Sequence, residues 1–158
     1  MNRIGAAAAV ALALFACGES ARDALDAARK SLAETHYAEA IAAADAGLAR
    51  SPERVTSWGL EQVKLEALAR AGRGDETLAQ LARLTNDWPD NVKADQFAAT
   101  ADQLKGAGQG PAAIQVLDLG LKRFPDDAGL RGQIEKAKSA SAPGSAELER
   151  LKSLGYIN

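Results

Sequence analysis

Residues 37–52 read YAEAIAAADAGLARSP. Small and aliphatic residues recur through this segment at spacings of three and four, from Ala40 and Ile41 to Leu48, which is the pattern of one buried helix face. Alanine has the highest helix propensity of all residues. Pro52 closes the segment, because proline cannot continue a helix. The segment therefore predicts a helix with a closely packed face of small side chains.

The same pattern returns twice further along the chain. Pro52, Pro89 and Pro125 are separated by 37 and 36 residues, and an aliphatic residue stands eleven positions before each of them. The residues seventeen positions before these prolines, which predict a turn, are Thr35, Gly72 and Gly108. A further apolar helical run precedes each turn. Each unit is therefore expected to consist of a helix, a short turn, a second helix and a closing proline.

This organisation resembles the tetratricopeptide repeat family, whose unit is a helix pair with small residues at the helix contact and a proline at the end. The best matches are residues 37–52 and residues 108–125. The resemblance covers about residues 21–138 and implies an all-α fold, with residues 20–139 forming one repeat domain. That fold would be a short right-handed helical-hairpin solenoid of about three tetratricopeptide-like units, followed by C-terminal capping helices.

Small side chains are expected to let the helix backbones approach closely in the first and third units. These residues are Ala40, Gly47, Ala113 and Gly120. The second unit carries Thr77 and Leu84 at positions where smaller residues are usual in the family. We therefore expect looser helix packing in the second unit.

The residues after the third proline predict capping elements. Residues 126–139 predict one more helix, and residues 140–144 form a linker of Ser, Ala, Pro and Gly. In residues 145–158, Ser145 suits a helix N-cap and leucines recur at every third position. This last segment is expected to be a capping helix and tail that fold onto the end of the solenoid.

The composition agrees with an all-helical protein and excludes several kinds of site. The chain of 158 residues contains 36 Ala but only ten Val and Ile together, and β-branched residues favour strands. A formal net charge of −2 argues against a nucleic-acid binder, which needs a basic face. With one Cys and one His, the chain can form neither an internal disulfide nor a metal site built from several Cys or His residues.

The N-terminal residues predict export. Residues 4–15 contain no polar side chain and would span about 18 Å as a helix, short of the ~30 Å bilayer core. The sequence LFACG that ends at Gly18 resembles the lipobox of bacterial lipoproteins. The resemblance implies that residues 1–16 are a signal peptide, that Cys17 receives a diacylglycerol and an N-acyl chain, and that residues 17–19 form a tether. The alternative is an ordinary cleaved signal followed by an incidental cysteine.

The lipobox resemblance also carries an expectation about location. In Gram-negative bacteria an Asp directly after the lipidated cysteine commonly retains a lipoprotein in the inner membrane, and this chain has Gly18 there. We therefore expect an exported protein anchored to the cell envelope. In a Gram-negative host, the periplasmic face of the outer membrane is favoured.

No arrangement of residues in the sequence predicts catalysis. His36 is interpreted as a turn residue, because no second His or Cys is available to complete a site. The glycines of residues 106–110 lack the spacing of a phosphate-binding loop and are interpreted as a helix-to-helix turn. Acidic pairs are interpreted as helix starts. We expect a protein without catalytic or metal site, whose only prosthetic groups are the acyl chains on Cys17.

The two tryptophans are given different roles. Trp58 lies on the first helix of the second unit and is expected in the core between helices. Trp88 precedes Pro89 and is expected to be half exposed, where it could pack on the next unit or contact a partner or lipid headgroups.

In the tetratricopeptide family, the first helix of each pair lines a concave binding face. By register, the candidate groove residues are Arg22, Arg29, Gln62, Glu66, Arg70, Asp95, Asp102 and Lys105. Their alternative role is that of ordinary solvated residues. The resemblance implies a lipid-anchored adaptor that binds a protein or peptide partner in the envelope. The alternative function is that of an accessory subunit of an envelope enzyme or export system that binds a small ligand or glycan.

Overall fold

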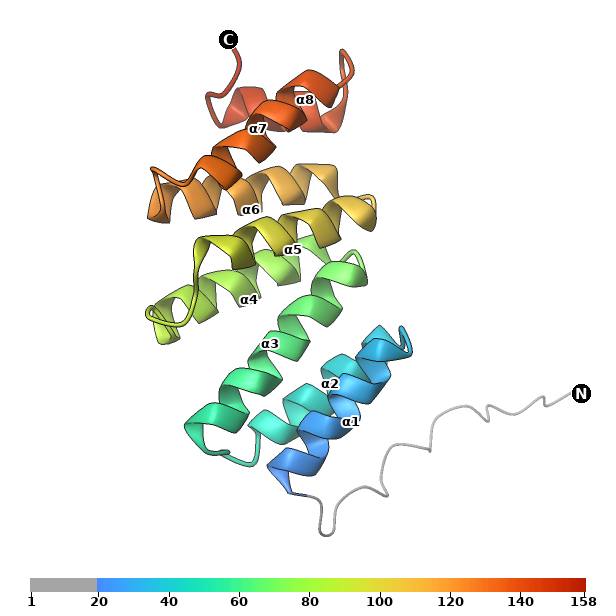
Figure 1. Ribbon diagram of the computed structural model, residues 1–158. Helices are drawn as coiled ribbons and strands as arrows, with labels where there is room; N and C mark the ends of the chain where they lie inside the picture. The colour runs from blue at the N-terminus through green and yellow to red at the C-terminus, as the bar shows by residue number, and fades with distance from the viewer. Residues whose placement is uncertain (1–19) are drawn as a thin grey trace, which may run out of the picture.

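The computed structural model describes residues 20–158 (Figure 1). Within this range the chain is all-α, with eight helices and no strand, which confirms the all-α part of the predicted fold. The helices follow one another along the molecule, so that α1 and α2 lie at one end and α7 and α8 at the other (Figure 1). The predicted signal peptide, the lipobox and Cys17 lie outside the described residues.

The helix boundaries follow the repeat pattern of the sequence. The helices are α1 (Ala21–Ala33), α2 (Tyr37–Leu48), α3 (Arg54–Arg70), α4 (Gly74–Asp87), α5 (Ala94–Gly106), α6 (Gly110–Arg123), α7 (Ala128–Ala140) and α8 (Ala146–Ser153). Pro52, Pro89 and Pro125 each lie in the connection after an even-numbered helix. The predicted N-cap Ser145 is confirmed, and Ser20 caps α1 in the same way, because each hydroxyl accepts a hydrogen bond from a backbone N–H of the helix that follows.

The three predicted turn positions share one backbone conformation. Thr35, Gly72 and Gly108 have φ angles of 62°, 71° and 76°, in the left-handed region. Each of them ends the first helix of a pair and lets the chain reverse into the second. Glycine adopts this region without strain, whereas a β-branched residue such as Thr35 does so at a cost.

Two glycines permit close contact between neighbouring helices. A Cβ added at Gly47 of α2 would lie 2.8 Å from the methyl carbons of Leu60 on α3 and 3.1 Å from the Ala24 Cβ on α1. A Cβ added at Gly120 of α6 would lie 2.9 Å from the Phe97 Cβ on α5 and 3.0 Å from a Leu130 methyl carbon on α7. Both glycines therefore fill equivalent places, each between two odd-numbered helices.

The second unit packs differently, as the sequence predicted. The contact between α3 and α4 is less extensive than the contacts of α1 with α2 and of α5 with α6. Leu84 and Thr77, the larger residues of this unit, are both fully buried. The bulk of Leu84 at the position of Gly47 and Gly120 accounts for the reduced contact.

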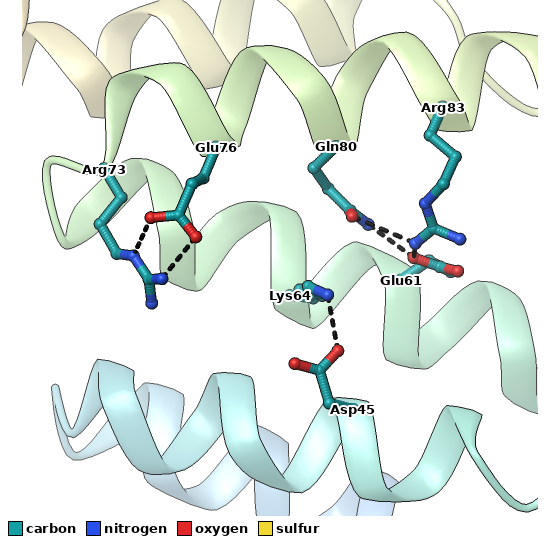
Figure 2. A network of polar contacts seen from close by, with 7 residues as sticks. All are labelled: Asp45, Glu61, Lys64, Arg73, Glu76, Gln80 and Arg83. Atoms are coloured by element: carbon teal, nitrogen blue, oxygen red, sulfur yellow. Dashed lines mark hydrogen bonds and ion pairs between the residues drawn. The ribbon is translucent and has the colours of Figure 1, made fainter.

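A polar network joins the helices of this second unit (Figure 2). Glu61 of α3 is 4% exposed and accepts a hydrogen bond of 2.5 Å from Gln80 Nε2 of α4. The Arg83 guanidinium, also on α4, donates to the same carboxylate oxygen. On the other side of α3, Lys64 Nζ lies 2.6 Å from Asp45 Oδ1 of α2. These contacts link α2 to α3 and α3 to α4.

The apolar core forms two clusters. One is built by α1, α2 and the near face of α3, and the other extends from α3 to α8. In the second cluster, Leu151 of α8 is fully buried, and α8 packs against α6 and α7. None of the helices in residues 20–158 combines the length and the apolarity that a membrane span requires.

Candidate functional site

The eight predicted groove residues lie on three helices that are neighbours in space. Arg22 and Arg29 belong to α1, the residues from Gln62 to Arg70 to α3, and those from Asp95 to Lys105 to α5. Because α1 contacts α3 and α3 contacts α5, these helices form a row (Figure 1). The row continues to α7, which contacts α5.

A cavity of about 420 Å³ lies between α3 and α5 and brings three of these residues together. Gln62 and Glu66 line it from α3, and Asp95 lines it from the first turn of α5. The remaining lining residues are Trp58, Leu65, Asn91, Lys93, Gln96, Ala99, Thr100 and Gln103. The volume falls within the range typical of small-molecule sites.

Planar polar side chains dominate this cavity. Its lining includes three Gln, one Asn, one Asp and one Glu, whereas Leu65 and Ala99 are its only aliphatic members. The sequence analysis missed Gln96 and Gln103 because it selected a single face of each first helix. It missed Asn91 and Lys93 because both lie in the connection after Pro89, to which no helical register applies. The density of amide side chains between residues 91 and 103 is the signal that could have identified them.

Two amide nitrogens of this cavity are buried without an acceptor. Gln62 Nε2 and Gln96 Nε2 have no hydrogen-bond partner within residues 20–158, although neither atom is accessible to solvent. Gln62 belongs to α3 and Gln96 to α5. Buried polar groups in folded proteins are almost always hydrogen-bonded. Because a water-sized group cannot reach either nitrogen, the two amides are unsatisfied donors within the protein and not donors offered to the cavity.

The charges that line the cavity are only partly compensated. Glu66 forms an ion pair of 2.7 Å with Arg70, one turn further along α3. Neither Asp95 nor Lys93 forms an ion pair with another described residue. The cavity thus presents both signs of charge at the start of α5.

The two tryptophans lie in contact with each other, and one of them is more buried than expected. Trp88 is 9% exposed, so the expectation of a half-exposed side chain is wrong. The centre of its ring lies 5.3 Å from that of Trp58, and the Arg54 guanidinium lies over the Trp88 ring, 4.4 Å from its centre. Trp58 is half-buried and packs against the core cluster, which confirms its expected place in part, while it also lines the cavity.

The other five predicted residues do not join this cavity. Asp102 and Lys105 line a second cavity of about 580 Å³ between α5, α6 and α7, where Gln133 Nε2 donates to Asp102 at 3.3 Å. Arg22 pairs with Glu53 at 3.4 Å. Arg29 pairs with Asp26 at 3.9 Å, and Arg70 with Glu66. These residues lie along the row of odd-numbered helices but are not brought together at one point.

His36 lies in the turn before α2, as predicted, with its Nδ1 3.6 Å from a Glu34 oxygen. Residues 106–110 form the turn between α5 and α6. Within residues 20–158, no group of three His, Cys, Asp or Glu side chains is placed to hold a metal ion. Comparisons with protein-family models, curated proteins and solved structures found no match to this chain.

Proposed function

We propose that this chain is a lipid-anchored, non-catalytic adaptor of a bacterial cell envelope, which binds a protein partner along the row of odd-numbered helices. The observation that carries this proposal is the sequence of contacts from α1 to α3, α5 and α7. These contacts align the helices that bear all eight predicted groove residues. A row of neighbouring helices presents an extended surface rather than a single pocket.

We further propose that the helices form a right-handed tetratricopeptide-like solenoid. Three repeated features support it: a left-handed turn residue in each of three helix pairs, a proline after each pair, and Gly47 and Gly120 in equivalent contacts. The position of α8 against α6 supports its role as a cap, because terminal repeats need a polar outer face.

The exposed side chains of the row suit a partner recognised through mixed charges. Arg29 and Arg70 are paired with acidic neighbours on their own helices, with side chains 58% and 43% exposed. Exposed ion pairs of this kind contribute little to stability and can exchange partners at small cost. If Arg29 and Arg70 left these ion pairs to bind acidic groups on another protein, they would add specificity to the complex without weakening the fold.

The start of α1 supports a short membrane tether. Arg50 Nη1 donates to the Ser20 carbonyl oxygen at 3.1 Å, and Arg22 pairs with Glu53. Both contacts hold the beginning of α1 against the connection between α2 and α3. If Cys17 is acylated, three residues reach at most about 10 Å, which would hold the first unit close to the headgroups.

Proximity labelling in a bacterial host tests the adaptor. The full chain is fused at its C-terminus to a labelling enzyme, and labelled envelope proteins are identified. The double variant Arg29→Glu/Arg70→Glu should lose the labelled partner, whereas the control Lys30→Glu/Lys152→Glu, outside the predicted groove, should keep it. A labelled set that the two double variants leave equally unchanged would contradict the proposed binding surface.

The anchor needs a separate experiment, because its failure would leave the binding surface intact. Metabolic labelling with an alkyne-bearing fatty acid should mark the natural chain, and Cys17→Ser should abolish the label and release the protein from membranes. An unlabelled natural chain would disprove lipidation.

A further inference from the structure

We propose that the molecule opens along the seam, which is the surface where α3 meets α4 and α5, by rotation about the turn at Gly72. The first module, α1 to α3, and the second module, α4 to α8, keep their own folds during this motion. The motion goes beyond the proposed adaptor function and does not depend on it, because the contacts that favour it all lie within residues 20–158.

The apolar core assigns α3 to the first module. α3 contributes four buried apolar side chains to the cluster that it shares with α1 and α2, namely Leu60, Val63, Ala67 and Leu68. It contributes only two, Leu65 and Ala69, to the cluster that extends to α8. Each module therefore keeps a core of its own when the seam opens, and opening exposes much less apolar surface than unfolding does.

The two modules are joined through α3. Neither α1 nor α2 makes an extensive contact with any helix from α4 to α8, whereas α4 contacts α6 and α6 contacts α8 (Figure 1). α3 and α5 are neighbours, but the cavity of about 420 Å³ lies between them. In the part of the chain that the structure describes, the only side-chain hydrogen bond of α5 is the one that Asp102 accepts from Gln133 of α7. No such bond joins α5 to α3.

Two buried amides oppose the closed seam. Gln62 Nε2 of α3 and Gln96 Nε2 of α5 have no hydrogen-bond partner among the described residues and no surface in contact with solvent. In the closed form each nitrogen has therefore lost water without gaining an acceptor, which costs free energy. Both side chains border the cavity between the two helices, so separation of α3 from α5 returns them to water. The amides thus favour the open form.

A small number of contacts holds the seam closed. At the start of α3, the centre of the Trp58 ring lies 5.3 Å from that of Trp88, which ends α4. Further along α3, the buried Glu61 carboxylate accepts a hydrogen bond of 2.5 Å from Gln80 Nε2 of α4 (Figure 2). Leu65 adds apolar burial. Because these few contacts are set against two unsatisfied donors, single substitutions can shift the balance between the closed and open forms.

The seam divides the row of odd-numbered helices. α1 and α3 lie on one side of it, and α5 and α7 lie on the other. Opening therefore changes the spacing between Glu66 of α3 and Asp95 of α5, which border the same cavity in the closed form. A partner that contacts both modules binds one form more tightly than the other and shifts the population toward that form.

Double electron–electron resonance on the full chain in detergent micelles tests the motion. Cys17→Ser removes the only native cysteine. Spin labels at Ala46→Cys of α2 and Ala82→Cys of α4 then report the distance between the modules from two exposed positions. The matched control places labels at Ala82→Cys and at the exposed Ala128→Cys of α7, both in the second module. We expect a short and a long distance for the first pair, and one distance for the control pair.

Glu61→Ala should increase the open fraction, because the buried Gln80 amide loses its acceptor. The ratio of the long-distance to the short-distance signal should rise by about tenfold. Far-UV circular dichroism of Glu61→Ala should show unchanged helix content, because both modules stay folded. A single distance between the modules in both the natural background and Glu61→Ala would overturn the proposal. A long distance accompanied by loss of helix would also overturn it, because it would indicate unfolding.

The two amides provide the opposite change. In the Glu61→Ala background, Gln62→Leu and Gln96→Leu each remove an unsatisfied donor from the closed form and should lower the same ratio by about tenfold. Gln133→Leu on α7 is the control and should leave the ratio unchanged, because its partner Asp102 lies in the same module. If both Leu variants left the ratio unchanged or raised it, the amides would not oppose closure and the proposal would be wrong.

Discussion

Gly120 of α6 faces Phe97 of α5 so closely that a methyl group at Gly120 would stand 2.9 Å from the Phe97 Cβ. The Phe97 Cβ is held by its own helix backbone, and the side chain is 1% exposed, so it cannot move aside. The contact explains why a glycine, an unfavourable residue inside a helix, stands at this position.

The first prediction concerns this contact. Gly120→Ala should destabilise the fold by about 1–2 kcal/mol, because the overpacking exceeds the gain in helix propensity. Gly132→Ala on α7 is the matched control: an added Cβ meets nothing within 4 Å there, so this variant should be stabilised by up to ~1 kcal/mol. Urea unfolding measures both. Equal changes in the free energy of unfolding for the two substitutions would show that the contact between α5 and α6 does not require a glycine at position 120.

The second prediction concerns the left-handed turn at Thr35. A β-branched residue with a φ of 62° is strained, and Thr35→Gly should stabilise the protein by about 0.5–1 kcal/mol. Thr35→Ala keeps a Cβ and should bring little gain. The converse change, Gly108→Ala, places a Cβ at a φ of 76° in open space and should cost about 1 kcal/mol through backbone strain alone. Differential scanning calorimetry would give the order of the three Tm values.

The third prediction concerns the buried carboxylate between α3 and α4 (Figure 2). Glu61→Ala should cost about 2 kcal/mol, because the buried Gln80 amide loses its acceptor while the half-exposed Arg83 can turn to water. The exposed pair of Arg73 with Glu76 provides the control, and Glu76→Ala should cost less than ~1 kcal/mol.

A double variant distinguishes a buried polar contact from simple side-chain packing. Removing both partners, as in Glu61→Leu/Gln80→Leu, should recover much of the stability lost in Glu61→Ala. A double variant no more stable than Glu61→Ala would contradict this account. Chemical denaturation measures the free energies of unfolding of these variants, and they can be compared directly if the variants share one m-value.

The fourth prediction is a loss of stability at high pH through Tyr156. Burial, together with the nearby carboxylate of Asp118 to which its hydroxyl donates at 3.1 Å, raises the pKa of Tyr156 from 10.0 to about 12. Because the folded-state pKa lies above the unfolded one, this contribution to stability is complete below pH 10 and is lost as the pH rises through about 12. The C-terminal tail should then detach from α6.

Absorbance of the phenolate at 295 nm measures the titration. The natural chain should show a component with a midpoint near pH 12, and Tyr156→Phe should lack it. The Phe variant should also lose less stability than the natural chain between pH 10 and pH 12. If Tyr156→Phe instead removes an absorbance change with a midpoint near pH 10, the contact between Tyr156 and Asp118 does not form.

Part of the candidate site could be predicted from the sequence. Gln62, Glu66 and Asp95 were selected by helical register alone, and the structure brings them to one cavity. Lys93 was not foreseen, because its position depends on the path of a connection without periodicity. Trp88 is buried against Trp58 and Arg54 from the first part of α3, and no sequence pattern near Pro89 predicts these contacts.

The helices, their turns and their caps follow from local chemistry that is written into the chain. Alanine-rich runs favour helix, prolines end it, and Thr35, Gly72 and Gly108 mark the reversals, all through interactions within a few residues. The packing of α3 against α4 and α5 depends instead on the sizes of side chains from distant segments. Close packing makes each contact depend on the volume available on both sides, so the cavity and its unpartnered amides arose only when the helices were assembled.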